Sequence, residues 1–388
     1  MLQHVFSAGF RPFFLLAACN AWASMLPWLV VLSGTAVPTQ GWPPHTLHAH
    51  EMLYGTVAPV IAGFLLTAVP NWTKSEPVRG PRLVGLVLLY LAGRLALVLA
   101  GTLGALTVAV IDIAFLPVLA WFVGAPIVRK QLWRNVPVVF VLLALSVANA
   151  AIHYGLATGN ATFLRVGTHG AVYFVVILML VISGRVVPAF TRNALIDRDR
   201  AQRIATARSV GAAAFVCGGL GMLTQLISPG HVVVAPLADF AGVFVLLRMR
   251  GWQSLATWRQ PMLWVLHAGH LWIALGFLLL GMSAHFGIGI GAAALHGFTA
   301  GAMGTLMLGM MARVTLGHTG RSIEADPATV VAFVCVIAGA AVRIIGGLGP
   351  VGMYRGSMLL GGVLFSLAWF VYTLAYTGKL VSPRADAA

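Results

Sequence analysis

Long apolar stretches dominate this sequence and restrict what it can fold into. A helix of about 20 residues crosses a hydrocarbon layer of ~30 Å. Twelve stretches reach that length, at residues 12–33, 47–70, 83–101, 104–125, 136–157, 163–187, 207–227, 231–248, 262–283, 289–311, 328–347 and 353–378. They do not show the short alternating segments of a β-barrel. The sequence therefore predicts an all-α, polytopic membrane bundle of twelve transmembrane helices.

The connections between these stretches are too short for a soluble domain, so we expect residues 1–388 to form a single integral membrane domain. The longest connection, from Arg185 to Arg208, has the polar composition of a cytoplasmic loop. Mean hydropathy is +0.93, which fits a chain that lies almost wholly in a lipid bilayer.

The basic residues predict the orientation. With the N-terminus inside, the cytoplasmic side holds 20 of the 24 lysines and arginines, and both termini are cytoplasmic. This asymmetry accounts for the net charge of +15 and leaves no basic stripe for nucleic acid, which we exclude as a partner. The three cysteines form neither CxxC nor CxxCH, so neither a disulfide framework nor covalent haem attachment is indicated.

A weak threefold repeat links the second, sixth and tenth stretches. Each ends near a threonine on the cytoplasmic side and carries a histidine in its outer half. His50, His169 and His296 precede these threonines by 23, 22 and 23 residues. This spacing suggests three groups of four helices with histidines at one depth, as a buried metal or haem requires. Coincidence is the alternative.

The segment HTLHAHEM, His45 to Met52, holds the densest cluster of ionisable groups. Such groups are costly beside a membrane span unless they serve a ligand or a proton. We predict that His48 and His50 ligate a metal, and that Glu51 orients the His48 ring or exchanges a proton. For His45 we favour a position in a hydrated outer loop.

Other histidines allow two interpretations each. His296 lies within hydrocarbon depth; its neighbours Gly297 and Gly301 form a packing motif that does not explain it. His169 is either a metal ligand or a hydrogen-bonded core residue. His267 and His270 share a helix face nearer the cytoplasm, where they would hold a second metal, relay protons or pack.

His153 and His285 are interpreted as residues of the outer boundary. Asp112 and Asp239 lie in the outer half of their spans, where buried carboxylates serve proton delivery or pair with a cation such as Arg94. Hydrated helix ends are the alternative for both acids.

On the inner side, Arg313, His318 and Arg321 form a cluster suited to an anion or a haem propionate. The positive-inside rule explains the arginines equally well.

Five blocks occur in order along the chain: AGFRPFFLLAA (8–18), HAHEMLYG (48–55), GFLLTAVPNWT (63–73), GRVVPAFTRN (184–193) and HGFTAGAMGTLMLGMMARVTLGHTGR (296–321). Together they resemble the NnrS family. The resemblance implies a bacterial inner-membrane protein with non-covalent, b-type haem and copper, associated with denitrification and with resistance to nitric oxide.

The family's characteristic histidines correspond to His48, His50 and His296, and less closely to His169 and His267. One departure is Leu47, where the family pattern has an aromatic residue; this puts the outer lid of the site in doubt.

Twelve helices in three groups of four also resemble the architecture of haem-copper oxidases and nitric oxide reductases. A likeness of architecture does not fix function. The sequence lacks an adjacent His-His pair on the seventh stretch, and the tenth offers one histidine where HxH is expected. An oxidase-type binuclear centre is therefore not supported.

The resulting hypothesis is a haem-copper membrane protein that binds or reduces nitric oxide near its outer face. His48 or His50 and His296 would hold haem iron, with Arg313 at a propionate. His169 or the second histidine of the HAHE block would bind copper. Reduction would need electrons from a quinol or cytochrome. One alternative is a transporter for haem, copper or an iron–nitrosyl species, and another is a non-catalytic assembly partner.

Overall fold

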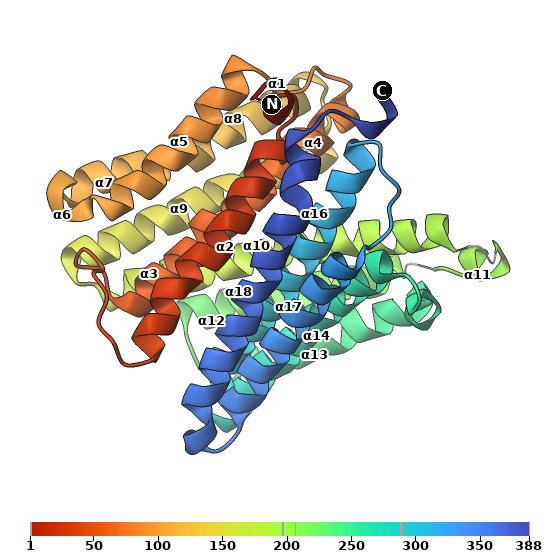
Figure 1. Ribbon diagram of the computed structural model, residues 1–388. Helices are drawn as coiled ribbons and strands as arrows, with labels where there is room; N and C mark the ends of the chain where they lie inside the picture. Colours follow the sequence, from red (N-terminus) through yellow and green to blue (C-terminus); the bar gives the residue numbers. More distant parts are fainter. Residues whose placement is uncertain (1, 196–197, 206, 288–289, 388) are drawn as a thin grey trace. The chain divides into compact units, whose positions relative to one another are not determined.

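The computed structural model describes residues 2–195, 198–205, 207–287 and 290–387. All regular secondary structure in these ranges is helical (Figure 1). Within them, ten helical segments are long and apolar enough to cross a membrane. They are α2 (Phe10–Leu32), α3–η1–α4 (Pro44–Thr73), α5 (Pro81–Val98), α7–α8 (Ala105–Arg129), η2–α9 (Trp133–Thr158), α10 (Ala161–Ala194), α12 (Arg208–Ile227), α14 (Pro261–Phe286), α17 (Pro327–Leu348) and most of α18 (Val351–Val381).

The other two predicted stretches are also helical. The stretch at 231–248 corresponds to α13 (Val234–Met249), whose 16 residues rise about 24 Å, less than a full hydrocarbon layer. The stretch at 289–311 corresponds to α15 (Ile290–His296), η5 (Gly297–Met303) and α16 (Gly304–His318), while residue 289 lies outside the described ranges. The prediction of a polytopic all-α membrane protein is confirmed.

The predicted loop from Arg185 to Arg208 is wrong over its first part. Helix α10 continues through Ala194, and a short helix, α11 (Arg198–Gln202), follows. Arg185 marks the polarity change expected at a membrane surface. Such a change does not end a helix, because the backbone hydrogen bonds continue unchanged into water.

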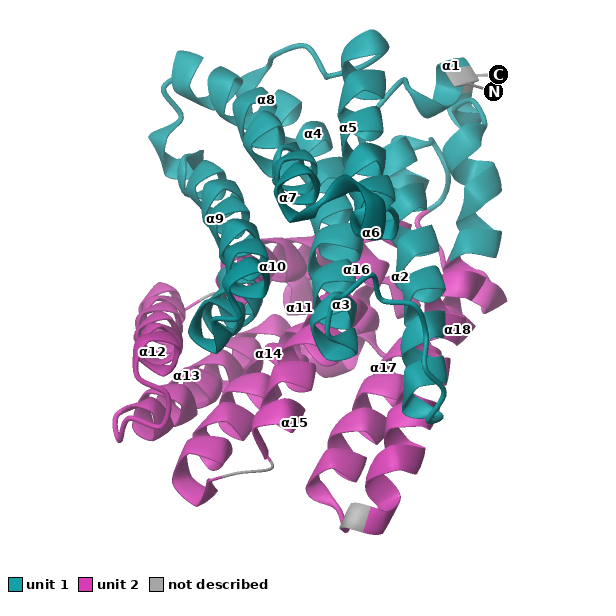
Figure 2. Ribbon diagram, turned by 90° about the vertical axis from the view of Figure 1, so that its left-hand side faces the viewer, with its two compact units in different colours: residues 1–174, 314–322, 373–388 teal, residues 175–313, 323–372 magenta. Residues whose placement is uncertain are grey.

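The described chain divides into two compact units, whereas the repeat predicted three groups (Figure 2). Unit 1 comprises residues 1–174, 314–322 and 373–388, and unit 2 comprises residues 175–313 and 323–372. The repeat has a structural counterpart at its threonines. Thr73, Thr191 and Thr319 are all buried, and each hydroxyl donates to the carbonyl four residues earlier, at 2.7–2.9 Å.

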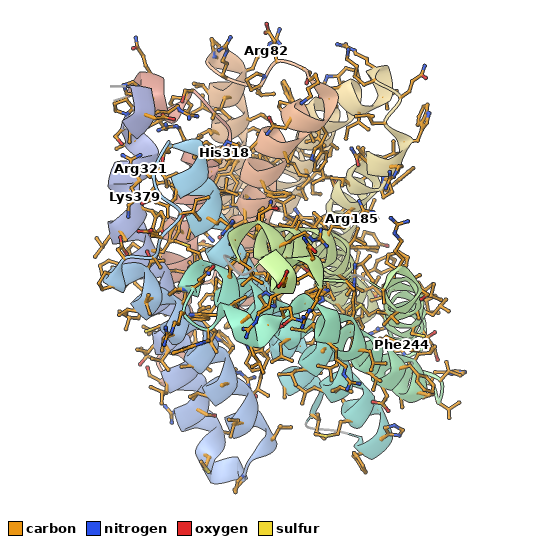
Figure 3. The ribbon with its side chains drawn as sticks, turned by 90° about the vertical axis from the view of Figure 1, so that its right-hand side faces the viewer. Arg82, Arg185, Phe244, His318, Arg321 and Lys379 are labelled. Atoms are coloured by element: carbon orange, nitrogen blue, oxygen red, sulfur yellow. The ribbon has the colours of Figure 1, made fainter. Side chains whose placement is uncertain are left out.

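Unit 1 holds both ends of the chain together. The buried Arg11 donates from Nη1 to the carbonyls of Leu380 and Ser382, both at 2.7 Å, and so satisfies the end of α18. Arg321 donates to the Ser382 hydroxyl at 3.0 Å, and Figure 3 shows His318, Arg321 and Lys379 in this part of the unit.

Two π-helical segments, η1 (Glu51–Val57) and η5 (Gly297–Met303), interrupt otherwise α-helical runs. Each follows directly on a histidine, His50 in unit 1 and His296 in unit 2. The α segment before each has seven residues, and so does each π segment. π turns in helices often occur at functional sites, because they redirect the side chains on either side.

Candidate metal centre

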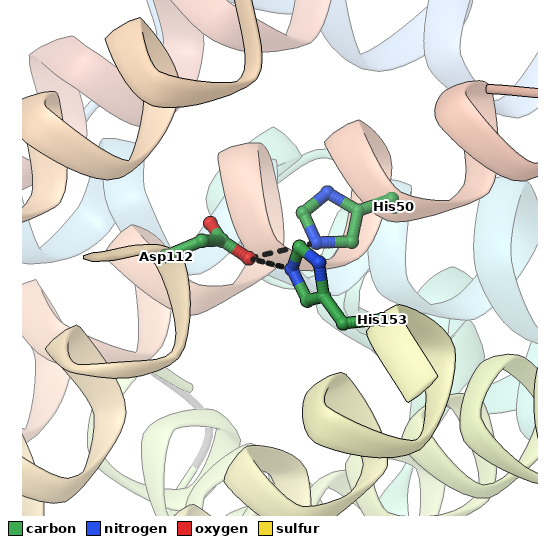
Figure 4. A group of neighbouring side chains, drawn as sticks. All are labelled: His50, Asp112 and His153. Carbon is green, nitrogen blue, oxygen red and sulfur yellow. Dashed lines mark hydrogen bonds and ion pairs between the residues drawn. The ribbon is translucent and has the colours of Figure 1, made fainter. Parts of the chain in front are cut away.

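Three buried side chains of unit 1 converge on one point (Figure 4). Nε2 of His50 and Nε2 of His153 each lie 3.0 Å from Oδ2 of Asp112. The three ligating atoms all lie within 4.8 Å of one another, and the most exposed of the three residues, His153, is 8% accessible. Two imidazoles and a carboxylate in this arrangement suit a transition-metal ion.

The π segment η1 fixes the position of His50. Pro59 has no N–H, so the helix leaves the Gly55 carbonyl without its usual donor. The Tyr90 hydroxyl supplies one at 2.6 Å. Asn20 donates to the Glu51 carbonyl at 3.2 Å, which supports the first π turn from α2. The displaced register is thus held by hydrogen bonds from two neighbouring helices.

Asp112 stands next to a break between two helices. Helix α7 (Ala105–Ile113) ends one residue later, and α8 (Phe115–Arg129) contains Pro117, which cannot donate to the Ile113 carbonyl. Helix α5 approaches closely here, because a Cβ built at Gly93 would lie 3.2 Å from Oδ1 of Asp112. The carboxylate therefore sits at a fixed position between α5 and α9.

Helix α9 contributes Asn149 and His153, which are four residues apart and share a face. Asn149 donates from Nδ2 to Oδ2 of Asp112 at 2.8 Å, and its Oδ1 lies 2.9 Å from Nε2 of His50. Because an amide oxygen only accepts, Nε2 of His50 carries a proton in this arrangement. A metal ion bound here would replace that proton.

Charges at the centre do not balance without a further cation. Arg94 pairs with both Glu51 and Asp112, and Glu51 Oε1 also lies 3.4 Å from Nδ1 of His50. One guanidinium faces two carboxylates, so one positive charge is missing in a largely dry environment. Either a protonated imidazole or a bound metal ion supplies it, because an unbalanced buried charge is costly.

Aromatic rings close the centre. Trp42 packs edge-on against His50 and His153, with ring centroids 5.0 and 5.3 Å away. The Tyr54 ring lies 4.8 Å from His50, and its hydroxyl donates to the Leu145 carbonyl at 3.1 Å. These rings keep water from the three ligating atoms, and electrostatic interactions among them are correspondingly stronger.

The donor set is compatible with metal geometry. Ligands at bonds of about 2.0–2.1 Å around a tetrahedral ion stand roughly 3.3 Å apart, and here both histidine nitrogens lie 3.0 Å from Oδ2 of Asp112, with all three atoms within 4.8 Å of one another. Two imidazoles with one carboxylate suit zinc, iron(II) or copper(II), and a fourth position stays open for a ligand. The residues present therefore fit a metal cofactor.

The family comparison extends over almost the whole chain. The family described as NnrS protein matches residues 4–384. The chain belongs to the NnrS family. A comparison with curated proteins returns no match. The helices of membrane length identify this NnrS chain as a multi-pass membrane protein, and the buried His/Asp group indicates a metal cofactor.

The predicted ligands of the NnrS chain are placed in different surroundings. His50 belongs to the converging group, while the ring of His48 stacks on Trp28 with centroids 4.7 Å apart and planes at 11°. Glu51 contacts His50 and Arg94. His169 is half-buried, and its ring lies 6.3 Å from Tyr173.

His296 in unit 2 has the tautomer that a haem ligand needs. Its Nδ1 lies 2.7 Å from the Ala292 carbonyl, which only accepts, so Nδ1 carries the proton and the Nε2 lone pair is available. The carbonyl also fixes the orientation of the ring, as outer-shell partners of metal-bound histidines do.

His267 has both ring nitrogens in hydrogen bonds. The Thr191 hydroxyl donates to Val187, so it accepts from Nε2 of His267 at 2.8 Å. Nδ1 then accepts from the Ser254 hydroxyl at 2.9 Å. This is the arrangement of a structural histidine, and a metal would have to displace one of the hydroxyls.

His270 differs from its neighbour. Ser183 donates to Met179, so it accepts from Nδ1 of His270 at 2.7 Å. Nε2 is buried with no hydrogen-bond partner in the described part of the chain. Arg313, predicted to hold a propionate, lies over the ring of Phe190 at 4.2 Å.

Sequence reasoning did not include His153 or Asn149 among the ligands and placed His153 at the outer boundary. His153 is buried where α9 faces Asp112. The spacing of four residues between Asn149 and His153 was the available signal. The predicted pairing of Asp112 with Arg94 is confirmed.

Proposed function

We propose that this NnrS chain is a metal-containing protein of the nitric oxide response that binds nitric oxide at the group formed by His50, Asp112 and His153. The observation that carries the proposal is the convergence of three buried ligating atoms in a membrane chain of this family. When bound, a copper or iron ion would supply an open coordination position for a small diatomic ligand.

The surrounding residues have distinct roles in this proposal. Asn149 fixes the Asp112 carboxylate, and Arg94 offsets the negative charge of Glu51 and Asp112. Glu51 contacts His50 at Nδ1, opposite the proposed metal-binding nitrogen, and so favours the ligating form of the ring. The same carboxylate–imidazole chain provides a path for protons.

Haem enters the proposal through His296. In unit 2 the available Nε2 of His296 would be a ligand to haem iron, and in unit 1 His48, stacked on Trp28, is a separate candidate. The family resemblance supports b-type haem and copper as the cofactors. Reduction of nitric oxide would also need a quinol or cytochrome as electron donor. We place the protein in the bacterial inner membrane as one domain with both termini cytoplasmic, and the metal group toward the periplasmic side.

A transporter for haem, copper or an iron–nitrosyl species is the second candidate. The half-buried His169 and the lone pair of His270 are features that a transported metal would use. In that case metal would bind weakly and exchange during purification, and nitric oxide would leave the spectrum unchanged.

The test is metal analysis of the purified full-length protein, with a visible spectrum before and after nitric oxide. We expect stoichiometric metal in the native protein and about tenfold less in Asp112→Asn or His153→Ala, because each removes a ligand. His285→Ala is the matched control, since it removes an exposed histidine that pairs with Asp239 at 2.8 Å outside the group.

Bound metal should also decrease in acid, because protons compete for imidazole and carboxylate ligands. Equal metal content in all four proteins, each folded by circular dichroism, would overturn the assignment.

A further inference from the structure

Unit 2 contains a buried arginine that the metal centre does not use. Arg343, on α17, is 7% accessible, and its Nη1 has no hydrogen-bond partner among the described residues. An arginine stays charged at any ordinary pH. A buried cation of this kind is costly unless an anion accompanies it.

The nearest partner that the structure shows is Tyr354, whose ring lies 5.4 Å from the guanidinium carbon. A phenol stays neutral below about pH 10, so Tyr354 contributes a cation–π contact and no opposite charge.

Acidic residues of the chain are too few to supply the missing charge. The sequence has nine, and Asp326 lies seventeen residues before Arg343, at the start of α17, which corresponds to about 25 Å along the helix. Asp239 is paired with His285. In unit 1, Glu51 and Asp112 are paired with Arg94. No carboxylate of the described residues is shown paired with Arg343, so an anion from outside the chain would supply its counter-charge.

The side of α17 that carries Nη1 of Arg343 faces helix α15. Helix α15, which carries His296, packs on α17. A Cβ built at Gly347 would lie 3.1 Å from Nη1 of Arg343 and 3.6 Å from Cβ of Ala293, one turn before His296, and these are its only neighbours within 4 Å among the described residues. Ala293 and His296 are three residues apart on α15 and therefore share a helix face.

We propose that Arg343 and His296 form an anion site for a carboxylate or small oxyanion. The planar guanidinium presents two parallel donors to such a group, and His296, whose Nδ1 faces the Ala292 carbonyl, belongs to the helix that packs against α17. The anion has two possible sources, the propionate of a haem ligated by His296 or a free oxyanion such as nitrite. The first source rests on the proposed function, whereas the second does not.

The experiment supplies the missing carboxylate from within the chain. In Gly347→Asp the new side chain stands one helical turn from Arg343 and competes with any external anion. Gly347→Asn has the same size without the charge and is the matched control. The full-length proteins are purified in detergent. Haem per chain is measured, and so is the thermal unfolding midpoint against sodium nitrite, with sodium chloride as the ionic-strength control.

If a propionate is the anion, Gly347→Asp should lower haem per chain about tenfold while Gly347→Asn keeps it, because a charge-assisted pair is lost. If a free oxyanion binds, nitrite should raise the unfolding midpoint of the native protein and of Gly347→Asn and leave Gly347→Asp unchanged.

Equal haem and equal nitrite response in all three proteins would overturn the anion site. Metal content at the His50 group, measured on the same samples, separates this failure from failure of the proposed function. It should stay constant in all three, because Gly347 lies outside that group.

Discussion

Arg94 is half-buried and Arg343 is buried, and each comes after a π-helical segment that is preceded by a histidine. Arg94, in unit 1, meets Glu51, directly after His50, and also Asp112. In unit 2 the residue after His296 is Gly297, where a Cβ would lie 3.1 Å from the Gly276 backbone. At this position unit 2 has a glycine that allows close helix packing, where unit 1 has Glu51. Arg343 therefore keeps its charge without a carboxylate partner.

The difference shows that similar helical frameworks can select ligands of opposite charge. At Arg94 two carboxylates outnumber one guanidinium, so the centre attracts a cation or a proton. At Arg343 one guanidinium has no carboxylate in the described part of the chain, so the site attracts an anion. The decisive variable is the count of acids around each arginine, because buried charges tend to be paired.

The largest expected effect follows from removing the paired arginine. Arg94→Met should destabilise the protein by about 3–5 kcal/mol, because Glu51 and Asp112 lose the cation that balances them. Unfolding by sodium dodecyl sulfate, followed by far-ultraviolet circular dichroism, measures the change. Arg82→Met, an exposed substitution on the same helix, is the control. A loss no larger than that of the control would show that the carboxylates are balanced in another way.

Replacing the unpaired arginine, Arg343, should increase the stability of the protein, whereas replacing Arg94 should decrease it. In a buffer free of small anions, Arg343→Met should stabilise the protein by on the order of 2 kcal/mol, because an uncompensated buried charge is removed. Thermal unfolding in a non-ionic detergent, followed by far-ultraviolet circular dichroism, measures the change, with the exposed Arg355→Met as control. Destabilisation comparable to that of Arg94→Met would break the comparison.

A smaller effect is expected at the π segment. Tyr90→Phe removes the donor to the Gly55 carbonyl and should cost about 1–2 kcal/mol, since a buried acceptor is then unsatisfied. Because η1 positions His50, metal content should also decrease. Tyr154→Phe, at an exposed tyrosine, should change neither quantity. Unchanged metal in Tyr90→Phe would mean that the π register does not depend on this bond.

Much of the fold was predictable because a bilayer imposes a length and a composition on every span. Each of the twelve predicted stretches corresponds to helix. The end of α10 was predicted too early, because polarity marks the membrane edge and not the helix end. The π segments were missed because their sequences, EMLYGTV and GFTAGAM, read as ordinary apolar helix.

For the candidate metal centre, the sequence indicated individual residues but did not show that His50, Asp112 and His153 come together. Its composition set His50 and Glu51 apart, and the buried positions of Asp112 and Arg94 suggested a pair. His153 was missed, because its role depends on which helix face meets Asp112, and periodicity alone does not give that rotation. The sequence likewise placed His267 and His270 on one face without showing that hydroxyls occupy both nitrogens of His267.

The sequence by itself determined that this chain is a helical membrane protein of the NnrS type, because apolar length, basic asymmetry and local blocks are properties of the linear chain. Only the tertiary structure decided which charges meet. His50 finds Asp112 and His153 from 62 and 103 residues away, and Arg343 finds no carboxylate among the described residues of its unit. Charged side chains pair only when they are a few ångströms apart, and they reach those distances only when the helices have packed.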